Sequence, residues 1–492
     1  MRILHVTHEF PPYEFAGTAI YTYNIVKALA NDHDVFVFSR LADKNQPDYT
    51  IVDENRSGYK VRLMNKPDLE WNPFEATYTD PKAEAIFTSY LDEVKPDLVH
   101  FQHILGMSYT CLEEVKKRKI AIVMTLHDFW TMCPMGQRMC YTDNSLCDDI
   151  DFAKCGPCCF GAEWTWDENA AKGKDTPAPG SKKPTFDQLF RHRYRYTPGV
   201  FARKPRAMAF AAGKVFGSMI GAKVDLPEPE VLSKNPFAVR TRKMIEALGH
   251  ADLLITPSAF LRDEFIRIFG ISPGRIVHSP NGMKFDHVTM HSRAASKVLR
   301  FGFMGSIIPT KGVHVLVEAA KKLKGIDGFK IDIFGAPNQW TVDYDKKIRK
   351  AAEGYDYITF KGRFDNKQVG KVLAEMDVLV VPSTWYENAP LTLNEAAMTK
   401  TPVLASDRGG MLEFVRDNEY GQTFELGNAD DLAKKMLALI EDPTQVSKLS
   451  GREVYIKPVI DNARELEAIY GRLVKGQAHE AKNYVYRTKV NA

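Results

Sequence analysis

Two glutamates with seven residues between them, Glu387 and Glu395, are the side chains best spaced to act on one ligand. The apolar run before them, residues 377–383, is typical of a buried parallel strand. Pro390 begins a stretch typical of a helix, because proline is tolerated where the first amides lack partners inside the helix. The loop between strand and helix therefore faces free amides, which favour an anion such as phosphate. Two acids beside that anion would repel it, so we expect them to bind neutral sugar hydroxyls on either side of it.

This layout predicts a site for a nucleoside diphosphate sugar. We expect Glu395 to bind the ribose, Glu387 to bind hydroxyls of the donor sugar, and the amides near Leu391 and Thr392 to bind the diphosphate. The alternative is an ordinary surface loop and helix with exposed glutamates. The expected donor contacts also include the residues between the two acids: Asn388, Ala389 and Pro390.

Two other segments supply polar groups at the ends of predicted strands. Residues 305–312 form a glycine-bounded loop in which Lys311 is a plausible partner for phosphate, although the loop is not a Walker motif. The strand at residues 120–125 leads into His127, and open α/β sheets bind ligands outside the carboxyl ends of their strands. A lone histidine is more often structural than functional, but this position favours a role in the site.

The glutamate pair in its strand–loop–helix setting resembles the signature of retaining glycosyltransferases with the GT-B fold, above all family 4. Residues 125–130, TLHDFW, followed by Cys133 and Pro134, resemble a subset of that family in which the histidine faces the donor sugar. The resemblance implies an α/β protein with two Rossmann-like domains whose parallel sheets face each other across a cleft. It covers nearly the whole chain except residues 161–245.

The resemblance carries over residue by residue, with two departures from the family pattern. Family 4 usually has two adjacent glycines in its first loop, and only Gly17 matches here. Its arginine and lysine clamp on the diphosphate corresponds to Ser306 and Lys311, so the lysine is expected to be the main cation. Arg363 lies where the family's base-binding loop lies and is expected to contact the base. His127, Glu387 and Lys311 are the expected catalytic residues.

The chain is predicted to divide into three parts. Residues 1–280 form an acceptor-side domain, residues 284–453 a nucleotide-sugar-binding domain, and residues 454–492 a helix that crosses back to the first domain. The first domain contains a cysteine-rich segment, residues 133–159, and a basic insertion at about residues 161–245. Asp128 is expected either to hold the tautomer of His127 or to cap the following turn.

The cysteine-rich segment contains a C-x-x-C pair, Cys155 and Cys158. Cys133 and Cys147 could complete a tetrahedral thiolate set for a structural zinc ion. Four thiolates leave no open position on the metal, so such a zinc would not be catalytic. The alternative is a loop of reduced, partly buried thiols.

The basic insertion contains no Asp or Glu from Arg191 to Val224. Basic residues interleaved with aromatic ones suit an anionic membrane surface or an acidic acceptor, and a solvated basic face is the plainer alternative. Nucleic acid is not expected, because the net charge is only +4 and no zinc-finger or helix–turn–helix pattern is present. The N-terminus is too quickly polar for a signal peptide, and no apolar run is long enough to span a membrane. We therefore expect a cytoplasmic protein, with the insertion as a candidate contact to the membrane.

Taken together, these residues predict a hexosyltransferase that uses a UDP- or GDP-sugar and a glycan or lipid-linked acceptor. Retention of configuration, the absence of a catalytic metal, and a role in cell-envelope polysaccharide synthesis, such as that of lipopolysaccharide, follow from the resemblance. The first turn lacks G-x-G-x-x-G, which argues against a nicotinamide or flavin enzyme. The alternatives are a GT-B sugar-nucleotide epimerase or phosphorylase, and a zinc-stabilised binding protein that uses the basic insertion.

Overall fold

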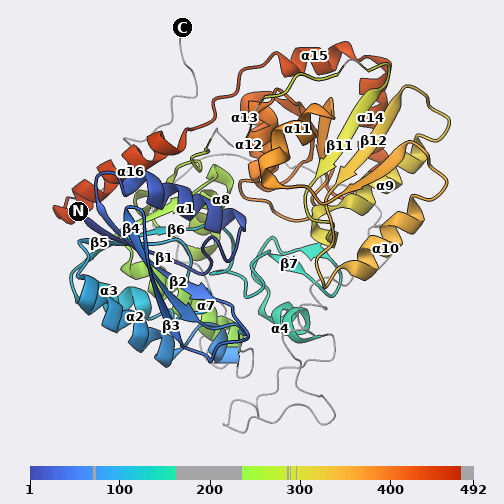
Figure 1. Ribbon diagram of the computed structural model, residues 1–492. Helices are drawn as coiled ribbons and strands as arrows, with labels where there is room; N and C mark the ends of the chain where they lie inside the picture. The colour runs from blue at the N-terminus through green and yellow to red at the C-terminus, as the bar shows by residue number, and fades with distance from the viewer. Residues whose placement is uncertain (70–73, 162–234, 285–287, 289, 295, 478–492) are drawn as a thin grey trace, which may run out of the picture.

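Two α/β halves, each built on its own sheet, make up the protein (Figure 1). The first half contains an eight-stranded sheet and the second a six-stranded sheet. This confirms the predicted α/β architecture. The computed structural model describes residues 1–69, 74–161, 235–284, 288, 290–294 and 296–477.

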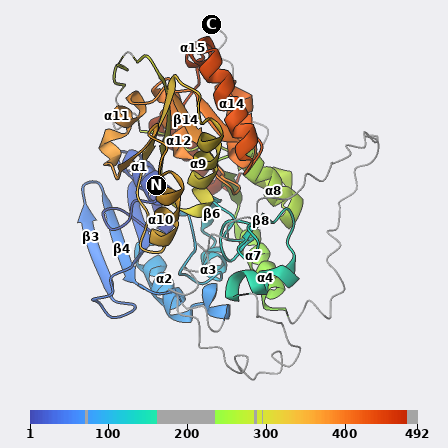
Figure 2. The ribbon, with the colours of Figure 1, turned by 90° about the vertical axis from the view of Figure 1, so that its right-hand side faces the viewer.

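The first sheet is parallel except at one edge, in the order β10-β9-β6-β5-β1-β2-β4-β3. Its central strands are buried on both faces, as expected of a parallel sheet covered on both sides. The outer strand β3 pairs antiparallel with β4, and it was not predicted because its residues alternate between half-buried and exposed (Figure 2). The strands are β1 (Arg2–Thr7), β2 (Asp34–Leu41), β3 (Ile51–Arg56), β4 (Tyr59–Asn65), β5 (Leu98–Phe101), β6 (Ala121–Thr125), β9 (Leu253–Thr256) and β10 (Ile276–His278).

Helices cover both faces of this sheet (Figure 1). In β1, Ile3 packs into a core shared with α1 and α16, while Leu4 packs into a core shared with α2, α3, α7 and α8. Local caps define the ends, as in α2, where Asp80 accepts hydrogen bonds from the first-turn amides. The elements are α1 (Gly17–Leu29), η1 (Phe74–Thr77), α2 (Pro81–Val94), α3 (Cys111–Lys117), a hairpin of β7 (Met139–Cys140) and β8 (Ser145–Leu146), α4 (Phe152–Phe160), α7 (Pro236–His250), α8 (Ala259–Phe269) and η3 (Pro273–Arg275).

The second sheet is parallel throughout, in the order β13-β12-β11-β14-β15-β16. Its strands are β11 (Leu299–Met304), β12 (Phe329–Phe334), β13 (Ile358–Gly362), β14 (Val378–Val381), β15 (Val403–Ser406) and β16 (Gly421–Phe424). Its helices are η4 (Pro309–Lys311), α9 (Val313–Lys322), α10 (Val342–Ala351), η5 (Asn366–Gln368), α11 (Val369–Ala374), α12 (Leu391–Met398), α13 (Gly409–Asn418), α14 (Ala429–Glu441) and α15 (Thr444–Ser450).

Helix α7 corrects the predicted extent of the basic insertion. Residues 236–245 were assigned to the insertion, yet they lie in α7 and bury Phe237 and Met244. The basic stretch itself lies within residues 162–234, outside the described residues. No helix in the described ranges is long and apolar enough to cross a membrane.

The last helix, α16 (Val459–Val474), packs against α1 of the first half (Figure 1). Tyr470 places its hydroxyl 2.5 Å from His100 Nδ1, and Tyr21 donates a hydrogen bond to Asn462 Oδ1 at 3.0 Å. The helix was predicted from residue 454, but residues 454–458 precede it, and Pro458 forms a bridge with Met283. Proline has no amide hydrogen to donate to an earlier turn, so the helix does not extend back through Pro458.

Candidate active site between the two halves

The loop after β14 holds the carboxylate of Glu387 in one place. Its Oε1 accepts hydrogen bonds from Lys311 Nζ at 2.6 Å, Ser383 Oγ at 2.9 Å and Trp385 Nε1 at 2.9 Å. The residue is 5% exposed. Burial of a carboxylate is tolerated because charged and neutral donors satisfy it. Within the described residues Oε2 has no hydrogen-bond partner, so it is the oxygen that a ligand would meet.

Glycines from other segments fix the backbone of this loop. The Gly410 amide donates to the carbonyl of Glu387 at 2.7 Å, and a Cβ on Gly410 would lie 1.6 Å from the carbonyl oxygen of Asn388. A Cβ on Gly312, where φ is 72°, would lie 1.7 Å from the carbonyl oxygen of Pro382. Gly409 and Gly410 begin helix α13, so the start of this helix lies against the Glu387 loop.

Helix α12 starts beside this loop with open amides. Pro390 is its N-cap, so the helix begins at Leu391, one residue later than predicted. The N-cap provides no side-chain hydrogen bond to the first-turn amides. The first-turn amides of Leu391 and Thr392 therefore stay available to an anion. A Cβ on Gly17 would lie 3.9 Å from Leu391 Cδ1, so the first loop of the chain reaches this helix start. Glu395, one turn further on, is 9% exposed.

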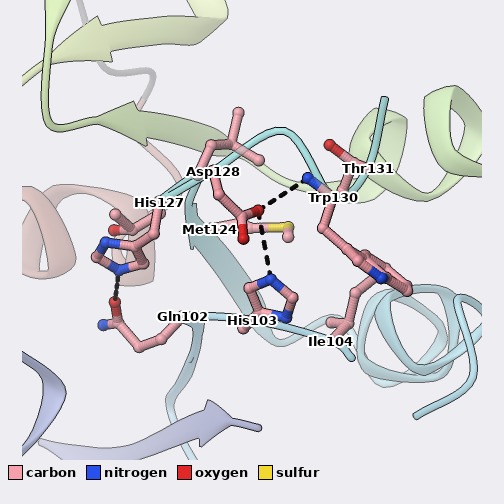
Figure 3. A pocket seen from close by; sticks show the side chains of 10 residues that line it. Gln102, His103, Ile104, Met124, His127, Asp128, Trp130 and Thr131 are labelled. Carbon is pink, nitrogen blue, oxygen red and sulfur yellow. Dashed lines mark hydrogen bonds and ion pairs between the residues drawn. The ribbon is translucent and has the colours of Figure 1, made fainter. Parts of the chain in front are cut away.

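His127 meets the Glu387 loop from the other half of the molecule. Asn388 Nδ2 donates to the carbonyl oxygen of His127 at 2.9 Å. The imidazole Nε2 lies 2.9 Å from Gln102 Oε1, so it carries the hydrogen and leaves Nδ1 as an acceptor (Figure 3). Burial lowers the pKa of His127 to about 3, and the ring is therefore neutral at physiological pH.

Asp128 caps the following turn and pairs with His103. Its Oδ1 accepts the Trp130 amide at 2.8 Å, which caps the following turn as one of our two alternatives proposed. The other alternative was wrong, because the imidazole nearest to it belongs to His103, with Nε2 3.4 Å from Oδ1 (Figure 3). His127 instead pairs with the amide of Gln102.

Side chains from both halves pack together next to this site. Tyr386 stacks on Phe260 with ring centroids 5.4 Å apart, lies 6.3 Å from Phe129, and donates its hydroxyl hydrogen to Asp148. Glu413 accepts hydrogen bonds from the Ala259 and Phe260 amides at 2.9 and 2.7 Å, which caps helix α8. The two halves are thus in direct contact around the loop that carries Glu387.

Two family models match this chain in its two halves. The one described as Glycosyltransferase Family 4 matches residues 15–149, and the one described as Glycosyl transferases group 1 matches residues 291–453. The chain belongs to the family 4-like glycosyltransferases with the GT-B fold. This confirms the predicted family.

Relatives of this family 4-like protein are distant. It is 28% identical over 224 residues to the D-inositol 3-phosphate glycosyltransferase of Mycobacteroides abscessus, across 43% of this chain and 48% of the relative. It is also 28% identical over 223 residues to the glycogen synthase of Mycobacterium tuberculosis, across 44% and 51%. The chain spans about half the length of the curated relatives it matches.

Solved structures share the fold over nearly the full length. The sucrose-phosphate synthase of Thermosynechococcus elongatus matches with a TM-score of 0.59 at 16% identity, covering 96% of this chain and 99% of that one. The HepE protein of Anabaena, in complex with UDP and glucose, matches with a TM-score of 0.53 at 14% identity, covering 97% and 99%. At these identities the likeness concerns the fold.

Two predicted donor contacts of the family 4-like protein lie apart from the Glu387 cluster. Ser306 follows β11 and Arg363 follows β13, and both side chains are exposed. Neither side chain forms a hydrogen bond or ion pair within the described part of the chain. Both follow strands that run parallel to β14, so they lie at the same edge of the sheet as the Glu387 loop.

The four cysteines of the predicted zinc set lie in one cluster, together with Cys140 and Cys159, and a structural zinc there stays a prediction. Cys155 and Cys158, expected to form a knuckle, lie in helix α4, and Cys158 Sγ donates to the carbonyl of Met139 at 3.6 Å. Across the described residues no three side chains of His, Cys, Asp or Glu are grouped to hold a metal ion, and Cys133 and Cys147 are free thiols. Burial raises the pKa of Cys147 to about 12, so this thiol stays protonated.

The residues that position the site were only partly visible in the sequence. Gln102 and His103 directly follow β5, and the sequence analysis did not identify them as partners of His127 and Asp128. The donors Ser383 and Trp385 were not singled out. Only their position in the sequence could have indicated this role, since both lie within four residues of Glu387 at the end of a buried strand. Spacing cannot show which way a loop side chain turns.

The buried histidine His5 predicts that the stability of the fold depends on pH. His5 is fully buried, and burial lowers its pKa from 6.5 to about 3. Below pH 6.5 the unfolded chain binds a proton at this residue that the folded chain does not, so stability falls as pH falls towards 3. We expect His5→Asn to reduce the slope of unfolding free energy against pH between 6 and 4 by up to about 1.4 kcal/mol per unit.

Urea unfolding at pH 7, 6, 5 and 4 measures this slope. The matched control is His291→Asn, because His291 is exposed and its replacement should leave the slope unchanged. Equal slopes for His5→Asn and the wild type would contradict a neutral buried His5.

Proposed function

We propose that this protein is a retaining glycosyltransferase that transfers a hexose-type sugar from a UDP- or GDP-sugar to a glycan or lipid-linked acceptor. One observation carries the proposal. The Glu387 carboxylate is fixed by three donors on Oε1, and its loop touches His127 across the contact between the two halves. A carboxylate held in this way, beside an open helix start, can bind a sugar hydroxyl next to a diphosphate.

The leaving diphosphate is assigned to Lys311 and helix α12. Lys311 uses one hydrogen of its ammonium group on Glu387, and its side chain is 32% exposed, so two donors remain for phosphate oxygens. The uncapped amides of Leu391 and Thr392 add the positive end of the helix, which contributes about 1–2 kcal/mol to an anion in a partly buried site. Negative charge grows on the diphosphate as the bond to the sugar breaks, so these groups lower the barrier.

We assign the donor sugar to three hydrogen-bond acceptors, two in the Glu387 loop and one on His127. Glu387 Oε2 and His127 Nδ1 are open acceptors, as described above. Asn388 is 6% exposed, and its Oδ1 has no hydrogen-bond partner in the described ranges. A buried acceptor left unpaired costs free energy, and a sugar hydroxyl would satisfy it.

The remaining features follow from the family resemblance. Retention fits front-face attack through an oxocarbenium-like state, since no second carboxylate is assigned as a nucleophile. Catalysis without a metal ion and a role in cell-envelope polysaccharide synthesis, on the cytoplasmic side, belong to the same proposal. UDP is the first nucleotide to test, because the structure of the Anabaena protein contains UDP and glucose.

Thermal stabilisation by UDP-, GDP- and ADP-sugars tests the donor site. We expect one nucleotide to stabilise the wild type by about 2.7 kcal/mol at a hundredfold excess over Kd. Glu395→Ala should lose most of that stabilisation, because it removes the carboxylate assigned to the ribose. Glu318→Ala, on the surface of α9, is the control and should keep it. No stabilisation of the wild type by any of the three would contradict a sugar-nucleotide site.

Product analysis tests the reaction itself. The anomeric configuration of the product by NMR reports retention, and activity that disappears with EDTA and returns with magnesium would contradict metal independence. A product formed from the donor alone, other than by hydrolysis, would indicate an epimerase. Release of a sugar 1-phosphate from a glycan by inorganic phosphate would indicate a phosphorylase.

A further inference from the structure

A path of buried polar side chains leads from His127 to the last helix, α16. Its members are Gln102, His5, His100 and Tyr470, and all four are fully buried. The path begins at the 2.9 Å contact between His127 Nε2 and Gln102 Oε1 (Figure 3). It ends on a helix that follows the second half along the chain and packs on the first half. The groups that position His127 therefore extend well below the candidate site.

Two imidazoles orient the amide of Gln102. Its Nε2 lies 3.4 Å from His5 Nδ1 and 3.2 Å from His100 Nδ1. An amide nitrogen has two hydrogens and only donates, so both ring nitrogens are acceptors and Oε1 faces His127. With the amide reversed, one of its buried hydrogens would have no acceptor among the described residues, which costs free energy. The observed orientation therefore places an acceptor against His127 Nε2.

Tyr470 joins this arrangement to α16. Its hydroxyl lies 2.5 Å from His100 Nδ1, and it donates because that nitrogen also faces the amide hydrogens of Gln102. The hydrogen of the His100 ring is then on Nε2, which donates to Thr125 Oγ1 at 2.8 Å. The rings of Tyr470 and His100 meet edge to face with centroids 5.7 Å apart. Helix α16 thus fixes one of the two rings that orient Gln102.

Helix α16 reaches His127 by a second route, through Tyr21. The ring of Tyr21 meets the ring of His127 edge to face, with centroids 5.1 Å apart. Its hydroxyl donates to Asn462 Oδ1 at 3.0 Å, and the Gly282 amide donates to the same oxygen at 3.0 Å. Asn462 lies in α16 and is 1% exposed. One helix therefore supports His127 through a hydrogen-bonded path and through a packed ring.

We propose that Gln102 is a positioning residue that keeps the ring hydrogen of His127 on Nε2. Helix α16 holds this arrangement in place through Tyr470 and Asn462. The inference rests on the proposed transferase function, in which His127 Nδ1 accepts a hydrogen bond from a hydroxyl of the donor sugar. A ring with its hydrogen on Nδ1 would present a donor there and lose that bond. The last helix thus takes part in donor recognition through the side chains of the first half.

Nitrogen NMR of the imidazole rings, in protein labelled at histidine, locates the ring hydrogen without any ligand. The signals of His127 are identified by their loss in His127→Asn. We expect the wild-type ring to carry its hydrogen on Nε2 alone. Gln102→Met keeps the length of the side chain and removes the amide, so the form with hydrogen on Nδ1 should appear. A wild-type ring with its hydrogen on Nδ1 would overturn the proposal, and so would an unchanged ring in Gln102→Met.

Kinetics connect the ring to donor use. Release of nucleoside diphosphate from the sugar nucleotide that stabilises the wild type gives kcat/KM. Gln102→Met should lower it about ten- to hundredfold, because a buried donor on His127 loses its acceptor. Gln422→Met is the matched control, since Gln422 lies in β16 and donates to Gln445 Oε1 at 3.3 Å, away from the candidate site. It should leave the His127 signals and kcat/KM unchanged.

Substitutions of tyrosine by phenylalanine test the part of α16. Tyr470→Phe and Tyr21→Phe each remove one hydroxyl and keep the packed ring. Each should lower kcat/KM about three- to tenfold, as expected for one lost hydrogen bond. Tyr357→Phe makes the same change in the second half, where the hydroxyl donates to the Ala320 carbonyl at 3.0 Å, and it should keep wild-type kcat/KM.

The outcomes separate this inference from the proposed function. A wild type that binds no sugar nucleotide contradicts the transferase, while the NMR experiment still decides where the His127 hydrogen lies. A merely structural role for Gln102 predicts lower thermal stability with unchanged His127 signals and unchanged kcat/KM, and that result would contradict the positioning role. Wild-type kcat/KM in both Tyr470→Phe and Tyr21→Phe would contradict the part assigned to α16.

Discussion

Replacing Lys311 by alanine is expected to lower kcat for sugar transfer by about a hundred- to a thousandfold, the range seen when one preorganised donor to a developing anion is removed. The variant loses the ammonium assigned to the diphosphate. It also leaves Glu387 with only Ser383 and Trp385 as donors on Oε1. Because the affected charge develops in the transition state, kcat should fall more than donor affinity. Steady-state kinetics with the stabilising sugar nucleotide measure both quantities.

Lys321→Ala is the matched control for this substitution. Lys321 pairs with Glu318 at 2.9 Å on α9, and its side chain is 31% exposed, against 32% for Lys311. A surface pair of this kind contributes little to stability, and it has no part in the proposed site. The control should retain wild-type kcat. A Lys311→Ala variant within threefold of the wild type would contradict the assignment of Lys311 to the leaving group.

Gly410→Ala is expected to abolish stabilisation by the donor and to lower activity by at least a hundredfold. The new Cβ would lie 1.6 Å from the carbonyl oxygen of Asn388, so the loop that carries Glu387 must move. A displacement of about 1 Å at reacting groups is enough for a loss of this size. Overpacking should also cost about 1–3 kcal/mol of unfolding free energy. Thermal unfolding with and without the sugar nucleotide gives both results.

Gly471→Ala provides the comparison. Gly471 lies in α16, and a Cβ there would meet no atom within 4 Å. The same chemical change in open space should keep both donor stabilisation and activity, and it should raise stability slightly because alanine favours a helix. If Gly410→Ala bound the donor as the wild type does, the tight approach of α13 to the Glu387 loop would not matter for the site.

Most of the fold could be predicted because its strands are apolar and short. Runs such as residues 120–125 and 377–383 read as strands and are observed as β6 and β14. The edge strand β3 was missed because it alternates half-buried with exposed residues and is stabilised by pairing with β4. Helix α7 was missed because its basic residues were grouped with the insertion, although Asn235 and Pro236 give it a capped start.

The site was predictable in its residue types but not in its hydrogen bonds. Glu387, Lys311 and His127 were named from motifs, and the structure places the first two in contact and the third against the same loop. That Asp128 turns to His103 follows from the path of the chain after β6, which spacing does not encode. The cysteine pattern predicted which thiols gather, because Cys133, Cys147, Cys155 and Cys158 pack in one cluster, but it did not show that the C-x-x-C pair lies within helix α4.

The two segments that cross between the halves are bonded to each other. Met283 donates to the carbonyl of Lys457 at 2.8 Å and accepts the Val459 amide at 2.9 Å, and Gly282 donates to Asn462 Oδ1 at 3.0 Å. Two paired crossings act as a hinge with one axis, since sliding or twisting the halves would break these bonds while rotation about the pair would not. Rotation of the halves about this line is the motion that would keep these bonds intact.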